Sequence, residues 1–449
     1  MRASLLGHAC LILEAGATRV ITDPLFFGPG ERTLDPCPKR VVHVDELGAF
    51  DAIVISHRHL DHFDAESLAR LDRRLPMFMP RDEELASRAR AKGFAKVTQL
   101  APWDEVGIGD FHLMVTPSHR HDVAEMGMVF IAPDAALWNQ VDTVVDQATC
   151  LRVLKRTNGA LDVVFCAYNP LLEHATMWYA ETDFPQARYE RLLEMAACSE
   201  ARLVVPGSFG LRMVGKYAHF NQRCYPVSRE RFVADFAKLA PEREAWILNP
   251  GDGVEVERAQ PPRKVAVPYA TTLEDDTALT RFAPETPMPE LVDENPTRFP
   301  DRELERGLEH IVMRVWPKIA AEVLAKGEGG PLLTLRSRRA TVDFEVVLPR
   351  RRRRFRLLRW SPALELAEVA PDDQDGADYT FTYVASQVYG VAVGRPYQVP
   401  EVLARRSGKT RPDGLTPIDP ARLAGVDAYS TTDENFGWSP LDILEGRRL

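Results

Sequence analysis

The segment His57-Arg58-His59-Leu60-Asp61-His62 holds three histidines and one carboxylate within six residues. Alternate residues of an extended segment point the same way, so His57 and His59 can grip one metal ion. Asp61 and His62 come where the chain turns and can reach a second ion nearby. Two metals at such a spacing can activate a water or bind dioxygen. We therefore expect a dinuclear metal centre in which Asp61 also takes part in catalysis; a solvated loop with chance histidines is the alternative.

Further ligands must come from other parts of the chain. Residues 116–122 follow an apolar run and offer His119 as the preferred third ligand of the first metal, with His121 as its alternative. Asp142 follows another apolar run, and we expect it to bridge the metals and to be catalytic; a turn or helix-cap aspartate is the competing interpretation. Asp23 closes a strand before a proline and can hydrogen-bond a ligand histidine from behind. His8 is expected behind the ligands as well, in an apolar strand, either as a core histidine or as a substrate contact.

Short apolar runs separated by turns must position these residues. Strands are expected over residues 4–13, 18–22, 52–56, 111–116, 128–132, 161–167 and 203–205, the first two joined across Gly16. One short helix is expected over 65–71. A second is expected over 184–197, where apolar residues repeat at helical spacing and Pro185 takes a permitted first-turn position. This order is a layered α/β pattern.

The second half of the chain predicts a separate, smaller fold. A Pro- and acid-rich stretch, 261–300, is expected to link the catalytic part, 1–260, to a small α+β domain, 301–400. An amphipathic helix starts at Asp301, and Pro317 is expected to kink it. Strand-like runs follow over 332–335, 341–348, 355–360 and 379–384. Residues 401–449 are expected to be an extended segment.

Composition excludes several classes of protein. A chain of 449 residues has room for two or three domains. A net charge of −9 and a pI of 5.8 give no general attraction to nucleic acid or anionic membranes. No apolar run approaches the roughly 20 residues that span a bilayer, and the first residues do not read as a signal peptide. The six cysteines form no C-x-x-C pair, which predicts reduced thiols in a cytoplasmic protein and excludes the usual cysteine zinc and iron–sulfur sites.

These residues together resemble the metallo-β-lactamase superfamily. The resemblance runs from Gly7-His8 through Asp23-Pro24, the segment 57–62, His119 and Asp142 to Val205-Pro206. It implies an αββα sandwich with a dinuclear site at one edge of the two sheets. Within the superfamily, Trp138 to Asp142 with 161–165 and 205–210 are similar to the branch that contains CMP-N-acetylneuraminate hydroxylase and Rieske-linked relatives, which implies oxidative chemistry.

The chain departs from these patterns in two places. It has no Rieske C-x-H…C-x-x-H motif, so electrons for dioxygen would come from a separate protein or from the substrate. Hydrolases of the superfamily place a final metal histidine after the last core strand, where this chain has Pro206-Gly207-Ser208-Phe209. His219 is the nearest histidine and a candidate replacement. An open, carboxylate-rich second site favours iron over a saturated zinc pair.

Three weaker signals remain. The run Arg350 to Arg354 is expected to be the solvated turn of a hairpin, with a nucleic-acid or phosphate site as the alternative. The C-terminal α+β domain resembles sterol-carrier-like folds, which implies an apolar cavity or a dimerisation surface. Tyr168, Glu173 and Trp178 could line the substrate entrance or could be packing residues.

The sequence therefore leads to a hypothesis with two rivals. We expect a diiron oxygenase that acts on a small polar metabolite or an amino-acid-derived intermediate, with a separate electron-donor protein. The first rival is a zinc or manganese hydrolase of an ester, amide or phosphodiester bond, with Asp61 orienting the attacking water. The second is a metal-bearing scaffold without catalysis, which the full ligand set disfavours. We expect no nucleic-acid or membrane partner, and a homo-oligomer stays open.

Overall fold

The computed structural model describes residues 1–28, 34–119, 123–172, 184–208, 210–258, 260–274, 281–325, 336–337, 339–360, 364–373, 377–393 and 405–408. The chain forms two compact units. Unit 1 comprises Met1–Leu171 and Phe184–Ala283, and unit 2 comprises Leu172–Asp183 and Pro284–Leu449. Each unit has its own hydrophobic core and is described by itself.

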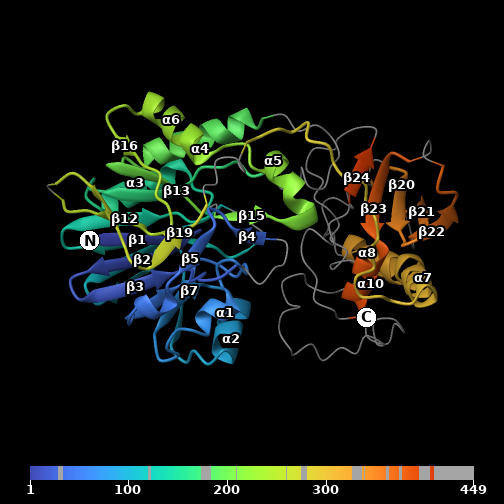
Figure 1. The fold of residues 1–449 in the computed structure, drawn as a ribbon, viewed down its shortest axis with the longest axis horizontal. Coiled ribbons are helices and arrows are strands. Elements are labelled where there is room, and N and C mark those ends of the chain that lie inside the picture. Colours follow the sequence, from blue (N-terminus) through green and yellow to red (C-terminus); the bar gives the residue numbers. More distant parts are fainter. Residues whose placement is uncertain are drawn as a thin grey trace. The chain divides into compact units, whose positions relative to one another are not determined.

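Two large sheets form the centre of unit 1 (Figure 1). The first has eight strands in the order β18 (Arg263–Ala266), β17 (Asp252–Glu255), β1 (Arg2–Gly7), β2 (Cys10–Ala15), β3 (Thr18–Thr22), β6 (Ala52–Val54), β7 (Met77–Pro80) and β8 (Val97–Leu100). The second has seven strands in the order β16 (Glu244–Ala245), β14 (Leu203–Gly207), β13 (Val163–Ala167), β12 (Ala135–Asn139), β11 (Met126–Ala132), β10 (Phe111–Pro117) and β9 (Glu105–Ile108).

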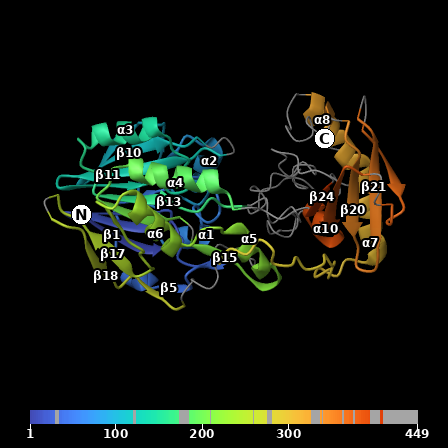
Figure 2. The ribbon, with the colours of Figure 1, turned by 90° about the horizontal axis from the view of Figure 1, so that it is seen from above.

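Helices cover the outer faces of both sheets, as Figures 1 and 2 show. The first sheet is covered by α1 (Ala65–Leu68) and α2 (Glu83–Ala91), and the second by α3 (Gln147–Arg156), α4 (Gln186–Cys198) and α6 (Arg229–Leu239). Smaller elements complete the unit: the pairs β15 (Leu211–Met213) with β4 (Leu34–Pro36) and β19 (Ala270–Thr272) with β5 (Arg40–Val42), the helix α5 (Asn221–Cys224), and the 3₁₀ turns η1 (Val44–Glu46) and η3 (Gly215–Phe220). The layers are α, β, β, α, which confirms the expected sandwich.

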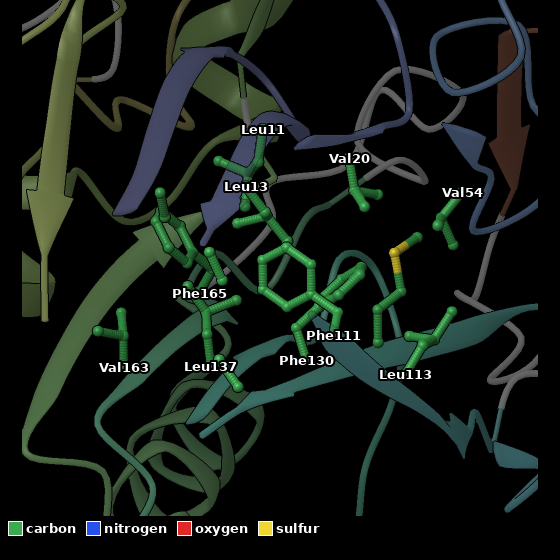
Figure 3. Packing of buried hydrophobic residues seen from close by; sticks show 14 of the residues in the cluster. Leu11, Leu13, Val20, Val54, Phe111, Leu113, Phe130, Leu137, Val163 and Phe165 are labelled. Atoms are coloured by element: carbon green, nitrogen blue, oxygen red, sulfur yellow. The ribbon is translucent and has the colours of Figure 1, made fainter. Parts of the chain in front are cut away.

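Strand residues alternate between the inter-sheet core and the helix-facing cores. Leu11 and Leu13 of β2 pack between the sheets with Leu137 of β12 and Phe165 of β13, as Figure 3 shows. Ile12, between the two leucines, packs on the other face with residues of α1 and α2. A strand buried on both faces reads as a continuous apolar run, which is why these strands could be located from the sequence.

The predicted strand over residues 4–13 is wrong in one respect that bears on function. The chain folds there into the antiparallel pair β1 and β2, and the turn between them contains His8. Gly7 has a φ of +120° and His8 a φ of +53°, so the backbone reverses where the sequence reads as one apolar strand. His8 therefore lies at the tip of a hairpin and not within a strand.

Several other boundaries also differ from the sequence prediction. The helix expected over 65–71 ends at Leu68, whereas the helix expected over 184–197 is confirmed as Gln186–Cys198. The strands β18 and β19 fall in the stretch expected to be a linker and pair with β17 and β5 of unit 1.

Unit 2 packs a helical layer against one five-stranded sheet. The sheet order is β22 (Glu365–Val369), β21 (Arg352–Arg359), β20 (Val342–Val347), β23 (Tyr379–Val384) and β24 (Arg405–Gly408). The helices are α7 (Asp301–His310), the π-helical turn η4 (Ile311–Val315), α8 (Trp316–Ala325) and α10 (Ala385–Ala392). The irregular turn lies just before Pro317, where a kink was expected. The strand expected over 332–335 lies outside the described residues.

The arginine run forms the expected solvated hairpin turn only in part. Arg350 and Arg351 are exposed in the turn between β20 and β21. Arg352 to Arg354 begin strand β21, and each arginine of the run lies within ion-pair distance of a carboxylate. Arg354 is buried with Glu345 at 3.0 Å. Charges neutralised in this way leave little positive potential for a polyanion.

Across the described helices, none combines the length and the apolar character needed to cross a bilayer.

Candidate metal centre

Five chain segments of unit 1 meet beside one end of the two sheets. Asp23 directly follows β3, and residues 55–62 follow β6, its parallel neighbour. Asp142 follows β12, the His8 turn joins β1 to β2, and the loop after β14 reaches His8 through Gly210. Carboxyl ends of parallel strands share one edge of a sheet, so residues distant in sequence converge there. A hydrogen bond from the Met126 amide to the Ser56 carbonyl, at 3.1 Å, ties the two sheets together at this point.

Two overlapping groups of side chains are placed closely enough to hold a metal ion. They are His8, Asp61 and His62, and His57, His62 and Asp142. The Nε2 atom of His62 lies 3.6 Å from Asp61 Oδ2 and 3.4 Å from Asp142 Oδ2. His59 lies beside the second group, with its Nδ1 atom 2.8 Å from His57 Nε2. The segment 57–62 therefore brings all four of its predicted ligands to one place.

Asp23 and Ser56 fix the orientation of two of these histidines. The buried Asp23 carboxylate accepts hydrogen bonds from the Ser56 amide at 2.7 Å, the Ser56 hydroxyl at 2.6 Å and His62 Nδ1 at 3.0 Å. Ser56 Oγ also lies 2.9 Å from His57 Nδ1. Because the Nδ1 atoms of both histidines face protein acceptors, their Nε2 lone pairs are left for a metal. Asp23 thus lies behind His62, one of the expected ligands.

In the metal-free state, the neighbouring charges favour a protonated His62 and ionised Asp61 and Asp142. Burial lowers the pKa of His62, but the carboxylates of Asp61, Asp142 and Asp23 outweigh it and raise that pKa well above its ordinary value. Burial raises the pKa of Asp61, but His62 and His8 outweigh it and hold that pKa well below its usual range. The pKa of Asp142 is lowered in the same way, with burial opposed chiefly by His62. Both carboxylates are therefore ionised and available as ligands at neutral pH.

The residues present fit a pair of divalent cations. Asp142 Oδ1 is buried, and no hydrogen-bond partner for it is found among the described residues. A buried ionised oxygen without a donor is costly unless a cation neutralises it. Imidazole nitrogens and carboxylate oxygens are the ligands of zinc, iron and manganese. We regard the centre as chemically suited to all three metals.

Backbone strain is concentrated at this centre. His8, Asp23, Val141 and Ser208 all have positive φ, at +53°, +39°, +54° and +66°. A positive φ is a marked outlier for a β-branched residue such as Val141, which directly precedes Asp142. Strain of this kind persists where the surrounding structure holds functional groups in place.

Some predicted site residues lie elsewhere in the described structure. His119 has its Nε2 atom 3.2 Å from Asp146 Oδ2 and is about half exposed, and neither group contains it. His219 lies in η3, where its Nδ1 atom bonds the Lys216 carbonyl at 2.8 Å, and it too is in neither group. Tyr168 is buried in the core between the second sheet and its helices. His121, Glu173 and Trp178 lie outside the described residues.

The sequence reasoning missed Ser56 and Glu125. Glu125 has a fully buried side chain, 3.8 Å from His57 Nδ1, and its Oε2 atom accepts a hydrogen bond from the Ser118 hydroxyl at 2.6 Å. Ser56 could have been found because it directly precedes His57 at the strand end. Glu125 precedes a strand without any flanking motif, so only the pairing of β10 with β11 brings it to the centre.

Comparisons with known proteins find similar sequences for the N-terminal part of the chain. Residues 2–132 match the family model of the beta-lactamase superfamily domain. Uncharacterized proteins of Mycobacterium bovis and Mycobacterium tuberculosis are 35% identical over 147 residues, which are 31% of this chain and 37% of each relative. The chain thus spans little more than a third of the length of these curated relatives. An N-acyl-phosphatidylethanolamine-hydrolyzing phospholipase D 1 of Caenorhabditis elegans is 32% identical over 73 residues, 15% of this chain and 20% of that protein.

Solved structures with similarity to the chain include enzymes of two kinds. An isothiocyanate hydrolase from Delia radicum gut bacteria has 19% identity and a TM-score of 0.42, covering 57% of this chain and all of that one. CmlA, a diiron beta-hydroxylase from Streptomyces venezuelae, has 14% identity and a TM-score of 0.40, covering 59% of this chain and 54% of that one.

Proposed function

We propose that this chain, whose residues 2–132 match the family model of the beta-lactamase superfamily domain, is a dinuclear metal-dependent hydrolase. The observation that carries the proposal is the convergence of His57, His59, Asp61, His62 and Asp142, with a buried Asp142 Oδ1 atom that has no hydrogen-bond partner among the described residues. In this proposal His57 and His59 would hold one metal, Asp61 and His62 would hold the other, and Asp142 would supply a further carboxylate ligand. His119 stays a candidate for the first metal.

The bound metals would supply a Lewis acid and an activated water at neutral pH. The protein contributes the positions of the groups around that water. Asp61 and Asp142 are ionised, as the direction of their pKa shifts requires, and can accept a hydrogen bond from the attacking water and orient it. Asp23 and Ser56 hold the imidazole rings still, which keeps the ligand geometry preorganised.

Two arguments favour hydrolysis over oxidation. Hydrolysis needs no electron donor, and the chain carries no Rieske motif of its own. The name of the matching Caenorhabditis elegans protein describes a hydrolytic enzyme, although the match covers a short part of both chains. Esters, amides and phosphodiesters are the bonds that such a centre can cleave.

A diiron oxygenase remains a second candidate because of one structural observation. No histidine stands at residues 206–208, and His219 is held by η3 rather than at the centre. The second metal would then be bound largely by carboxylates, which suits iron and dioxygen. The substrate would be a small polar metabolite or an amino-acid-derived intermediate, and a separate protein would deliver electrons.

Metal analysis combined with a reaction panel tests the proposal. The protein is purified without added metal, its content is measured, and it is assayed on a panel of chromogenic esters, amides and phosphodiesters while dioxygen uptake is recorded. We expect about two zinc or manganese ions per chain, turnover of at least one bond class and no dioxygen uptake. Two irons with dioxygen uptake and no hydrolysis would contradict the hydrolase proposal and support a diiron oxygenase.

A matched pair of variants ties any activity to the centre. Asp142→Asn removes the carboxylate charge at the centre and should lower kcat by about 10²-fold or more. Asp134→Asn makes the same change on the exposed turn between β11 and β12 and should leave kcat unaltered. Equal activity in the two variants would mean that the turnover does not come from this centre.

A further inference from the structure

His8 lies beside the expected ligands but differs from them in the hydrogen-bond partner of its second ring nitrogen. Its Nε2 atom lies 3.1 Å from Asp61 Oδ2 and 3.0 Å from His62 Nε2. Its Nδ1 atom accepts a hydrogen bond from the Gly210 backbone amide at 3.2 Å. The imidazole ring is buried, so water does not compete for either nitrogen.

The Gly210 bond determines which nitrogen of His8 carries the proton. A neutral imidazole has one N–H and one lone pair, and an amide N–H can only be accepted by the lone pair. The proton of His8 is therefore on Nε2, which faces Asp61. A histidine that binds a metal through Nε2 has the opposite arrangement, with its proton on Nδ1 and an acceptor behind it. His62 has that arrangement, because its Nδ1 atom faces Asp23.

We propose that His8 is a positioning residue, which donates its Nε2 proton to Asp61 and does not bind a metal itself. The inference rests on the proposed function, since it assigns a role within the metal centre. A donor on Oδ2 fixes the rotation of the Asp61 carboxylate, which comes from the turn after β6 and is the most exposed of the carboxylates at the centre. Two histidines in contact thus have different roles because different groups lie behind them.

The approach of the loop to His8 requires glycine at position 210. A Cβ atom added there would lie 2.4 Å from the His8 backbone nitrogen and 2.5 Å from its Cα atom. The same loop is anchored at Ser208, whose hydroxyl donates to the carbonyl of Val141, the residue before Asp142. The loop after β14 therefore contacts both His8 and the Asp142 turn, and it supplies a backbone N–H to His8.

Nitrogen NMR of histidine-labelled protein measures the tautomer directly. Long-range ¹⁵N–¹H spectra are recorded for the metal-free and the zinc-loaded protein, and the His8 signals are assigned by their disappearance in His8→Gln. We expect the proton of His8 on Nε2 in both states. A proton on Nδ1, with the Nε2 signal shifted on zinc loading, would make His8 a ligand and overturn the proposal.

Metal titration of variants gives an independent readout. His8→Ala should weaken zinc binding by roughly 10- to 100-fold, and His8→Gln, which keeps an N–H donor near the Nε2 position, should recover most of that loss. The visible spectrum of the cobalt-loaded protein should be unchanged in His8→Gln, because the metal ligands stay the same. His112→Gln, on the exposed side of β10, is the matched control and should bind zinc normally.

The outcomes separate this proposal from the proposed function. A His8→Gln variant that binds as weakly as His8→Ala and has an altered cobalt spectrum would show that His8 is a ligand. A wild-type chain that binds no metal would overturn the proposed function, whereas the tautomer of His8 in the metal-free protein would still decide whether it donates to Asp61.

Discussion

At the scale of single residues, the centre is organised by what lies behind each imidazole. Asp23 faces His62, Ser56 faces His57 and the Gly210 amide faces His8. Each partner selects the ring nitrogen that is left for the centre. The candidate ligands could be expected from the segment 57–62, but the ring nitrogen that each histidine of the centre presents follows from partners up to about two hundred residues away in sequence.

The Asp23 carboxylate offers the sharpest test at this scale. Asp23→Asn keeps the size of the side chain but weakens the acceptor of the His62 proton. We expect zinc affinity to fall by about 10- to 100-fold, measured by competition with a chromophoric chelator. Asp134→Asn should bind zinc as the wild type does, and unchanged affinity in Asp23→Asn would contradict the role given to it here.

The raised pKa of His62 predicts a pH dependence of metal binding. In the metal-free protein both ring nitrogens of His62 carry a proton at neutral pH, because its neighbours raise its pKa well above the ordinary value. A metal must displace one of these protons, so affinity should fall about tenfold for each unit that the pH drops below this pKa and level off above it. Calorimetry in two buffers of different ionisation enthalpy counts the protons. Release of no proton at neutral pH would mean that His62 is neutral before the metal binds.

At the scale of elements, a single glycine decides how closely two helices of unit 2 can pack. In unit 2, α7 and α10 touch at Gly307, where an added Cβ would lie 2.1 Å from the Tyr389 ring. That ring is buried against Phe299, with centroids 4.9 Å apart, and its hydroxyl donates to Glu303. The ring therefore has little freedom to move aside, and glycine is what allows the two helices to approach.

Gly307→Ala should consequently destabilise unit 2. Overpacking costs about 1 to 3 kcal/mol, which outweighs the gain of at most about 1 kcal/mol that alanine brings to a helix interior. Urea unfolding followed by circular dichroism measures the difference. Gly107→Ala, in β9 with no heavy atom within 4 Å of the added Cβ, is the control and should change stability little. A variant at Gly307 as stable as the wild type would show that the helices separate freely.

At the scale of the whole molecule, metal should stabilise one unit and not the other. All of the metal-competent groups among the described residues lie in unit 1. Ligand at a hundred times its dissociation constant adds about 2.7 kcal/mol, which for a unit of this size raises the melting temperature by roughly 5 to 10 °C. Calorimetry with and without a chelator should therefore shift one transition only. An equal shift of both transitions would mean that the units unfold together.

The sequence by itself determined the class of centre, most of the strands and the paired layers. Six adjacent residues at a strand end carry four candidate ligands, and strands buried on both faces appear as apolar runs, so both features are local in the sequence. The match of residues 2–132 to the beta-lactamase superfamily domain agrees with the resemblance drawn from those residues.

Only the tertiary structure decided the position of His8, the contribution of Glu125 and the place of His219. His8 reads as part of an apolar strand, but a hairpin turn and a loop after β14 set its ring beside Asp61. Glu125 reaches His57 through the pairing of two strands, and η3 holds His219 by the Lys216 carbonyl. The placements of His8 and Glu125 depend on contacts between segments far apart in the chain, and such contacts leave no periodic or local signal in the sequence.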